Sequence, residues 1–365
     1  MRTIVWLLDY VYLNYYEMKY YFFLLLLPAG VFAQTQNNYK VAIVAFYNCE
    51  NFYDTVHNPM INDIDFTPNG DYKYNTAIYL DKVQKLATVI SQIGTDINRD
   101  GIAMIGLAEI ENDTVLNDLI HSPLLIKRNY KIVHYDSRDA RGIDVALIYN
   151  PKYFTVEDSK PLFVVLPSRS KNARFTRDIL WVKGKLDGET IHVLVNHWPS
   201  RLGGDNISAP ARAAAAAVCK VQQAEIYKTE PDAKIIIMGD LNDEPTSPSV
   251  VKVLKAVSVI SDVKEGDIYN PWTELYNKGI GTLAYQDSWS LFDQIMITHP
   301  WLDKKQVGYF YYKQFVFNKD FMTENTGIFK GYPMRTWSGF NYRGGYSDHF
   351  PTYIVLLKKT QVYYR

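Results

Sequence analysis

The stretch that most constrains the fold of this chain is residues 234–245, which read KIIIMGDLNDEP. Residues 235–238 are consecutive apolar residues, a pattern typical of a strand covered on both faces of its sheet. Gly239 lets the backbone leave the sheet without a side-chain clash. Asp240 and Asn242 lie two residues apart, so in extended geometry their side chains point to the same side. This carboxylate and this amide can together hold a water molecule, a phosphate oxygen or a hydrated metal ion.

Residues 20–33 are predicted to belong to a secretory signal peptide rather than to the fold. The run contains no charged residue, ends in small residues and gives way to a polar sequence, which is typical of such peptides. It is short for a bilayer span, which takes about 20 residues. We therefore expect residues 1–33 to be an N-terminal extension and signal peptide, with Met18 as an alternative start, and the protein to be secreted or periplasmic. An uncleaved anchor is the alternative.

We expect the exported protein to begin at Gln34, because Val31 and Ala33 are the small residues that signal peptidase needs before its cleavage site. N-terminal sequencing of the exported protein checks this expectation. A mature chain that retains residues 20–27 would show an anchor instead. After cleavage we expect no integral membrane segment to remain.

Residues 34–365 are predicted to form a single domain, because no linker-like break follows residue 40. The 47% hydrophobic content allows a large core, and the two cysteines, Cys49 and Cys219, are too few for a disulfide scaffold. The net charge of zero argues against a protein that grips nucleic acid by charge alone. We expect a monomer.

Apolar periodicity predicts two helices. Residues 80–93 place apolar side chains on one helical face, and residues 54–79 before them are expected to form a long loop. A second helix over residues 208–227 is expected to be capped by Ser208 and to carry Pro210 in its first turn.

The same analysis predicts strands, two of which flank Asp187-Gly188, a strong hairpin signal. Several of the predicted strands end next to polar residues. Taken alone, each of these residues fits a turn, a solvated edge carboxylate or a structural histidine. Because α/β folds build their sites from loops at strand ends, the joint occurrence of these polar residues indicates one site. The predicted strands are residues 41–46, 102–108, 130–135, 143–149, 179–186, 190–195, 235–238, 291–298 and 351–357.

The order of these polar motifs resembles the endonuclease/exonuclease/phosphatase superfamily, the deoxyribonuclease-I-like fold, over roughly residues 40–358. The flanking sequences resemble a secreted bacterial branch of that superfamily. The resemblance implies an α/β (α+β) four-layer sandwich, in which two mixed β-sheets pack face to face between helices, and metal-dependent cleavage of a phosphoester. The motifs are Asn48, Glu109, Asn196-His197, Gly239-Asp240-Leu241-Asn242, Asp293 and Ser347-Asp348-His349.

The resemblance also implies a metal site. Glu109 matches the metal-binding glutamate of the family, Asn48 is expected beside the metal, and Asp348 is a candidate to complete the site. Hard oxygen ligands without a cysteine cluster suit Mg²⁺ or Mn²⁺, with Ca²⁺ as a further candidate. Such an ion polarises the phosphoryl oxygen and stabilises the leaving alkoxide.

The remaining motif residues match catalytic positions of the family. His349 matches the catalytic histidine, and Asp293 matches the carboxylate that orients it and favours its charged form. Asp240 and Asn242 match the pair that positions the attacking water and the phosphate. His197 is a candidate donor of a proton or a hydrogen bond to the phosphate. Whether Asp240 or His349 is the general base stays open.

Arginines flank the motifs, and their planar guanidinium groups suit phosphate oxygens. Arg177 matches a phosphate contact of related nucleases, while Arg141 and Arg201 are further candidates for which surface solvation is the alternative. Arg335 and Arg343 are open to the same two interpretations. Cys49 adjoins Asn48, but no histidine partner matches it, so we expect a small core residue rather than a nucleophile.

The leading interpretation is a secreted, divalent-metal-dependent phosphodiesterase, an endonuclease (or exonuclease) acting on DNA or RNA. The alternative is a phosphatase or phospholipase-type hydrolase acting on sugar, inositol or lipid phosphates, since the fold hosts all of these activities. A binding module that has lost its chemistry would lack motif residues, and every motif residue is present.

Overall fold

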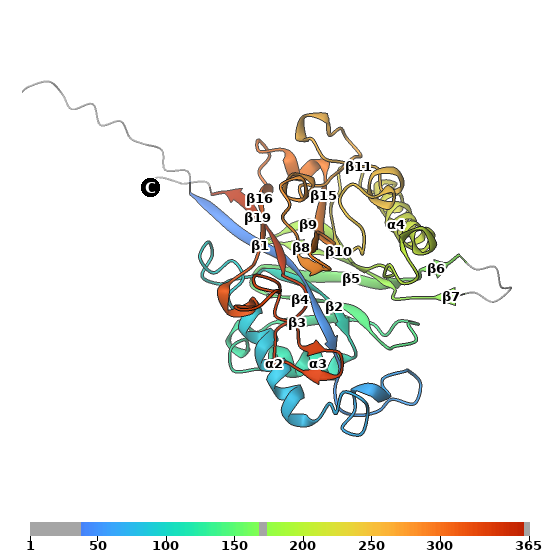
Figure 1. Ribbon diagram of the computed structural model, residues 1–365. Coiled ribbons are helices and arrows are strands. Elements are labelled where there is room, and N and C mark those ends of the chain that lie inside the picture. The colour runs from blue at the N-terminus through green and yellow to red at the C-terminus, as the bar shows by residue number, and fades with distance from the viewer. Residues whose placement is uncertain (1–37, 168–173, 361–365) are drawn as a thin grey trace, which may run out of the picture. The chain divides into compact units, whose positions relative to one another are not determined.

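A six-stranded mixed sheet contains the first and last strands of the computed structural model, which describes residues 38–167 and 174–360 (Figure 1). Its order is β16-β19-β1-β2-β4-β3. β1 (Tyr39–Phe52) is parallel to β2 (Met104–Ile110) and antiparallel to β19 (Thr352–Lys359). The remaining strands are β3 (Lys131–His134) and β16 (Phe310–Val316) at the two edges and β4 (Asp144–Tyr149) between β2 and β3. The expected signal peptide lies outside the described residues.

A second, seven-stranded mixed sheet has the order β11-β12-β15-β10-β9-β8-β5. The polar-ended strand predicted around residue 235 is β10 (Lys234–Asp240), which is parallel to β9 (Glu189–His197) and antiparallel to β15 (Asp293–Thr298). The remaining strands are β5 (Phe154–Leu162), β8 (Ile179–Leu186), β11 (Ala256–Val257) and β12 (Ile268–Tyr269).

The two sheets pack face to face through their apolar inner faces. Phe46 and Met104 of the first sheet share a buried cluster with Val195 and Met238 of the second. Gly106 permits this close approach, because an added Cβ would lie 2.6 Å from the Met238 sulfur and 2.9 Å from Val195 Cγ1. Burial on both faces of each sheet therefore explains why the sequences of its inner strands are unbroken apolar runs.

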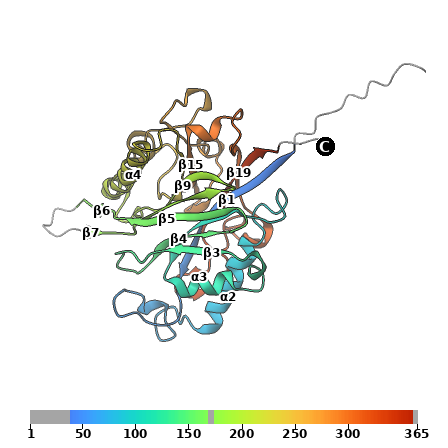
Figure 2. The same cartoon turned by 180° about the vertical axis from the view of Figure 1, so that it is seen from behind.

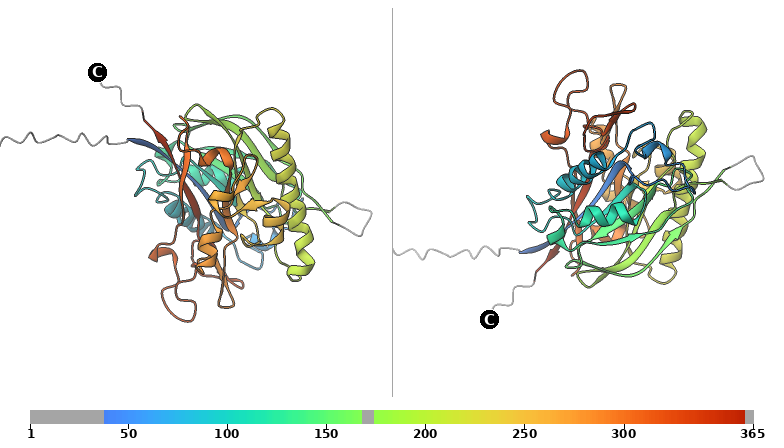
Figure 3. Two further views of the ribbon diagram at one scale, coloured as in Figure 1. Left: turned by 90° about the horizontal axis from the view of Figure 1, so that it is seen from above. Right: turned by 90° about the horizontal axis from the view of Figure 1, so that it is seen from below.

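Helices cover the outer faces of both sheets (Figures 1, 2 and 3). α2 (Thr76–Ile90) and α3 (Asp113–Ile120) share a buried cluster with the six-stranded sheet. α4 (Asp205–Tyr227) shares another with the seven-stranded sheet. The predicted four-layer sandwich of two mixed sheets between helices is confirmed. Among the described residues, no helix combines the length and apolarity that a bilayer span requires.

Helix boundaries differ from the sequence prediction where capping decides them. α2 begins at Thr76 rather than residue 80, because the side chain of Asn75 accepts hydrogen bonds from the backbone of Ala77 and Ile78. α4 begins at Asp205, so the prediction that Ser208 caps it was wrong. Ser208 instead donates its hydroxyl to the Gly204 carbonyl at 2.8 Å.

The position of Pro210 also differs from the prediction, because it lies inside α4 rather than in its first turn. The Asp187-Gly188 hairpin between β8 and β9 is confirmed, and both turn residues have positive φ, 50° and 87°. Short elements that the sequence analysis did not resolve are α5 (Thr273–Asn277), β6 (Val165–Leu166), β7 (Arg174–Phe175), β13 (Leu283–Tyr285), β14 (Ser288–Ser290), β17 (Trp337–Ser338) and β18 (Asn341–Tyr342).

The strand directions bring the predicted motifs to one edge. β1 and β2 are parallel, as are β9 and β10, so each pair delivers its last residues together. β15 and β19 run antiparallel to their neighbours and therefore contribute their first residues at that same edge. Asp240 at the end of β10 is consequently in register with His197 on one side and Asp293 on the other.

Candidate active site

Asp240 is the residue on which both sheets converge. Asn48, from the first sheet, donates its Nδ2 to Asp240 Oδ2 at 3.0 Å. The Nε2 atoms of His197 and His349 lie 3.6 and 3.9 Å from the same oxygen. These four side chains are buried, and burial raises the pKa of Asp240 to about 6 although His349 nearby opposes the shift.

His349 and Asp293 form a buried pair. His349 Nδ1 lies 2.7 Å from Asp293 Oδ2, while Asp293 Oδ1 is buried without a hydrogen-bond partner. Burial alone would lower the pKa of His349, but the carboxylates of Asp293, Asp240 and Asp348 raise it well above its usual range. The pairing that the sequence implied is therefore present as geometry, with Nε2 left free to face Asp240.

The Ser347-Asp348-His349 motif fixes the histidine to the neighbouring strand. The Ser347 hydroxyl donates to the Asn48 carbonyl at 2.7 Å and accepts from the His349 backbone N–H at 3.1 Å. A small hydroxyl residue before the histidine therefore connects the C-terminal motif to Asn48, which itself binds Asp240.

The loop after β10 departs from the geometry that its sequence suggested. The strand continues through Gly239 to Asp240, so the prediction that the chain leaves the sheet at Gly239 was wrong. Glycine is required there because an added Cβ would lie 2.4 Å from the Asn196 carbonyl oxygen. Asn242 has a φ of 49° rather than an extended one, and its N–H donates to Asp240 Oδ1 at 2.9 Å.

Glu109 sits in an irregular part of the first sheet. It has a φ of 61°, and the pairing of β2 shifts register around it. Glu50 and Asn51 in β1 also have positive φ, a conformation that costs non-glycine residues about 1–3 kcal/mol and is concentrated at functional sites. The bulge directs Glu109 so that Oε2 accepts the Asn51 N–H at 2.7 Å and Oε1 lies 3.9 Å from His197 Nε2.

The residues present fit a divalent metal ion at Glu109. Its side chain is only 15% exposed, and among the described residues its ion pairs within 4.0 Å involve only His197. A largely buried carboxylate with no lysine or arginine partner favours a cation, and oxygen ligands suit Mg²⁺ or Mn²⁺. Asp240, Asp293 and His349 also offer possible metal-ligand atoms, which lie within 4.8 Å of one another.

Asp348 has a different environment from Glu109. Its Oδ2 lies 2.7 Å from Arg335 NH2, so the predicted third metal residue already has a cationic partner. Its Oδ1 lies 3.9 Å from His349 Nε2. Burial opposes ionisation of Asp348, but His349 and Arg335 hold the pKa of this carboxyl below its usual value.

Glu50 and Lys82 form a buried charge cluster that the sequence analysis missed. Lys82 donates to the Thr336 hydroxyl at 2.6 Å, and Glu50 accepts the Thr336 N–H at 2.6 Å. Burial, followed by the charge of Asp348, raises the pKa of Glu50 to about 7. Lys82 stands on the apolar face of α2 beside Val83, and a lone cation on such a face was the available signal.

His197 is set apart from His349 by its surroundings. It is buried, its Nδ1 has no hydrogen-bond partner, and burial together with Arg177, Arg141 and His349 lowers its pKa well below the usual range. A neutral imidazole can donate one hydrogen bond and accept another. Of the two roles left open for His197, this environment favours hydrogen bonding over acid catalysis.

The candidate phosphate-binding arginines differ in what they contact. Arg177 is buried, and donates to the Trp198 carbonyl at 2.7 Å and to Asp139 Oδ2 at 3.1 Å. Arg141 has a side chain 47% exposed, with Nε 3.7 Å from Asp139 Oδ1. Arg201 donates to the Asn242 carbonyl at 2.9 Å. Arg177 and Arg201 thus hold the backbone behind the site, whereas Arg141 presents its guanidinium to solvent.

The cysteines are buried. Burial raises the pKa of the Cys49 thiol to about 12, which keeps it protonated and unreactive at neutral pH. The environment of Cys49 agrees with the expected core role.

Known proteins share this architecture. The sequence pattern of the endonuclease/exonuclease/phosphatase family matches residues 43–358. No curated protein sequence matches the chain. Among solved structures, an endonuclease/exonuclease/phosphatase family protein from Bacteroides thetaiotaomicron matches with a TM-score of 0.54 and 16% identity, covering 89% of this chain and 100% of that one.

Two further structures have named activities or ligands. A mannosyl-6-phosphatase from Bacteroides thetaiotaomicron VPI-5482 matches with a TM-score of 0.53 and 16% identity, covering 86% of this chain and 99% of its own. TDP2 from D. rerio, complexed with a single-strand DNA product, matches with a TM-score of 0.51 and 12% identity, covering 87% and 99%. At these identities the likeness establishes the fold alone.

Proposed function

Because the chain belongs to the endonuclease/exonuclease/phosphatase family and is therefore a phosphoester hydrolase, we propose that it is a metal-dependent phosphodiesterase that cleaves nucleic acid. One observation carries the proposal: Asn48 and His197 from the two sheets, together with the Asp293–His349 pair, converge on Asp240, with Glu109 beside them. We also propose export, on the sequence of residues 20–33.

We assign the metal site to Glu109 with Asn48 beside it. Mg²⁺ or Mn²⁺ bound there would neutralise phosphate charge and stabilise the leaving alkoxide, and Ca²⁺ is a weaker candidate because phosphoryl transfer sites usually use the smaller ion. Asp348 is already paired with Arg335 at 2.7 Å. We therefore assign Asp348 to the charge balance around His349 rather than to direct coordination.

We assign acid and base from the hydrogen bonds. Asp293 accepts from His349 Nδ1, an arrangement that favours the protonated ring and leaves the Nε2 proton for the leaving oxygen. Asp240 Oδ2 lies 3.6 and 3.9 Å from Nε2 of His197 and His349, so Asp240 is the group that can take the proton of an attacking water. The Asn242 N–H holds Asp240 Oδ1 in place at 2.9 Å.

The substrate class follows from the fixed positive charge at the site. A monoester dianion requires more positive charge than a diester monoanion, yet Arg177 and Arg201 already bind protein oxygens. Arg335 is likewise held, by Asp348 at 2.7 Å. Arg141 therefore remains as the exposed guanidinium near His197, with its nearest carboxylate, Asp139, at 3.7 Å. One metal ion, a histidine acid and one arginine fit the single charge and the poor leaving group of a diester. The fold shared with a mannosyl-6-phosphatase keeps monoester hydrolysis as the second candidate.

We expect kcat/KM to be higher for bis-p-nitrophenyl phosphate than for p-nitrophenyl phosphate, in Mg²⁺ and in Mn²⁺. Plasmid nicking should also fall steeply with salt, because each neutralised phosphate contributes about 0.9 to the slope of log affinity against log salt. Arg141→Ala should reduce that slope by about 1. The matched control is Arg99→Ala. Arg99 is exposed and follows Asn98, whose side chain donates to the Val41 carbonyl, at the end of β1 far from the active site.

Two other outcomes of these assays would contradict the nuclease assignment. A preference for the monoester, with plasmid intact at every salt concentration, would reject the nuclease assignment and favour a phosphatase. A flat salt response with a diester preference would point to a small-molecule diester held by the inner site alone.

A further inference from the structure

A second group of potential metal ligands lies where β3 ends and β4 begins, and shares no residue with the site around Asp240. His134, Asp136 and Asp144 offer ligand atoms that lie within 4.8 Å of one another. His134 faces Ala146 across the two strands, and extending this register by two residues sets Asp136 opposite Asp144. Residues two apart on a strand share a face, so His134 and Asp144 belong to one face of the sheet, and Asp136 follows the end of β3 with its carboxylate close to both.

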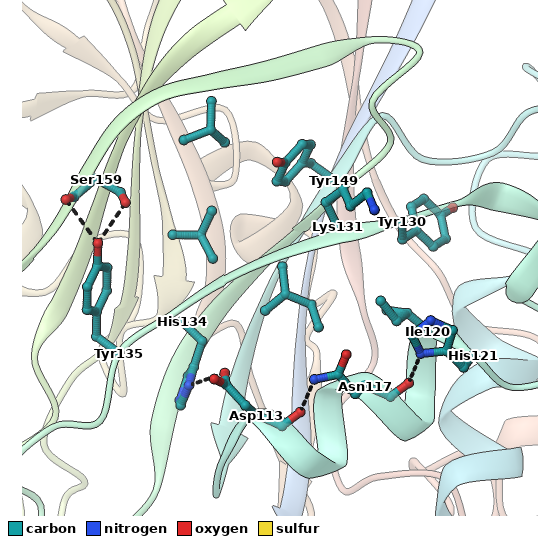
Figure 4. A pocket seen from close by; sticks show the side chains of 13 residues that line it. Asp113, Asn117, Ile120, His121, Tyr130, Lys131, His134, Tyr135, Tyr149 and Ser159 are labelled. Atoms are coloured by element: carbon teal, nitrogen blue, oxygen red, sulfur yellow. Dashed lines mark hydrogen bonds and ion pairs between the residues drawn. The ribbon is translucent and has the colours of Figure 1, made fainter.

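His134 is oriented as a metal-binding histidine would be. Its side chain is 2% exposed, and Nδ1 lies 2.9 Å from Asp113 Oδ1 at the start of α3, a contact drawn in Figure 4. Its Nε2 is 3.4 Å from Asp144 Oδ2 but is buried without a hydrogen-bond partner. Metal-binding histidines commonly donate one ring N–H to a carboxylate while the other nitrogen faces the ion.

Negative charge exceeds positive charge around His134. Asp113, Asp136 and Asp144 surround one imidazole, so even a protonated ring leaves negative charge in excess. Arg138 does not supply the balance in this cluster, because its guanidinium stacks on Phe163 and Phe175 at 4.2 and 4.3 Å. Close carboxylates facing each other across strands destabilise the sheet unless a cation lies between them.

Neighbouring acidic groups show the same excess. Burial, together with the carboxylates of Asp54, Asp63 and Asp144, raises the pKa of Glu111 to about 8. Asp144 Oδ1 is already held by the Ser137 N–H at 2.8 Å, which leaves Oδ2 toward His134. Asp136 is exposed, so an ion has a path from solvent to the cluster.

We propose that His134, Asp136 and Asp144 bind a second divalent cation, of which Zn²⁺ is the best match. One imidazole and two carboxylates with an open position suit a four-coordinate transition-metal ion better than Mg²⁺, which prefers oxygen ligands and retains its waters. The ion joins the end of β3 to the start of β4 across residues 137–143. This connection carries Asp139, which binds Arg177, so the ion stabilises a segment adjoining the active site.

The test is Zn²⁺ binding to the purified protein by equilibrium dialysis, with four variants. His134→Gln and Asp136→Asn should each bind one tightly held Zn²⁺ ion fewer than the wild type. The expected loss of Zn²⁺ affinity is about 100-fold or more, because removing even a residue that only hydrogen-bonds a metal ligand typically costs about 10–100-fold. Glu109→Gln should retain that equivalent, because its change lies at the active site. His121→Gln should match the wild type, because His121 is an exposed histidine that lines the pocket of Figure 4 together with His134 but belongs to no ligand group among the described residues.

Thermal unfolding gives a second measurement that needs no activity. An ion that binds only the folded state raises Tm with its concentration, so Zn²⁺ should raise Tm of the wild type and of Glu109→Gln by more than it raises Tm of Asp136→Asn, which keeps only the active-site ligands. Equal numbers of tight equivalents in wild type and Asp136→Asn would overturn the proposal and leave His134 as an imidazolium between Asp113 and Asp144. Because Asp136 is exposed, this variant decides the outcome even where His134→Gln does not fold.

Discussion

Alanine at position 349 is expected to lower kcat on a phosphodiester by roughly 10²–10⁴-fold, the usual contribution of a general acid or base. His349 Nε2 faces Asp240, and Nδ1 is held by Asp293 at 2.7 Å. Removing the ring therefore removes both the proton donor and the cation that offsets the buried charge of Asp240. His121→Ala, at an exposed histidine, is the control and should retain wild-type kcat.

The partner variant, Asp293→Ala, should act through the same histidine. If Asp293 works by orienting His349 and favouring its protonated form, the double variant should be little slower than the slower single variant. Single-turnover rates of the four proteins complete the cycle. A double variant that shows the full product of the two single losses would mean that the residues act independently, in spite of their hydrogen bond.

Glutamine at position 109 is expected to weaken Mg²⁺ binding by about 10-fold or more while the protein stays folded, because one charged oxygen leaves a hard-cation site. The amide oxygen of glutamine can still accept the Asn51 N–H that Glu109 Oε2 accepts at 2.7 Å. The bulged backbone therefore keeps its hydrogen bond while the charge is lost. Calorimetric titration of Mg²⁺ into both proteins measures the difference.

Glu111→Gln is the matched control, two residues further along the chain. Burial and neighbouring carboxylates raise the pKa of Glu111 to about 8, so at pH 7 its side chain is mostly neutral and glutamine is a close replacement. Its Mg²⁺ affinity should equal that of the wild type. Equal affinity in Glu109→Gln as well would remove Glu109 from the metal site.

The core of the site could be predicted from sequence because each motif carries its chemistry locally. Asp240 comes two residues after an apolar run that is typical of a doubly covered strand, and His349 lies three residues before the start of another buried strand. The strand directions then bring the two side chains together without further information. The family resemblance added Glu109 and Asp293, which the structure places 3.9 Å from His197 and 2.7 Å from His349.

What the sequence did not reveal depends on contacts between distant segments. Glu50 and Lys82 meet through Thr336, more than 250 residues further along the chain, so the cluster could not be recognised locally, and the only local signal was the lone cation of Lys82 on the apolar face of α2. Gly239 was expected to end a strand, but it is required by the nearby Asn196 backbone of β9.

Local energetics explain the errors in helix α4. Its start at Asp205 rather than near Ser208 was missed because Gly204 offers no side-chain cap to recognise. The helix continues past Pro210, where tertiary burial of residues such as Ala215 and Cys219 outweighs the local penalty of proline.

Hydrolysis of bis-p-nitrophenyl phosphate across a metal titration, from excess EDTA to saturating Mg²⁺ or Mn²⁺, tests the assignment of a metal-dependent diesterase most directly. We expect no turnover in EDTA, a saturable recovery with either ion in the wild type, and a recovery displaced to higher metal concentration in Glu109→Gln. Turnover that persists in EDTA, or that recovers at the same metal concentration in both proteins, would contradict a metal-dependent phosphodiesterase built on Glu109 and Asp240.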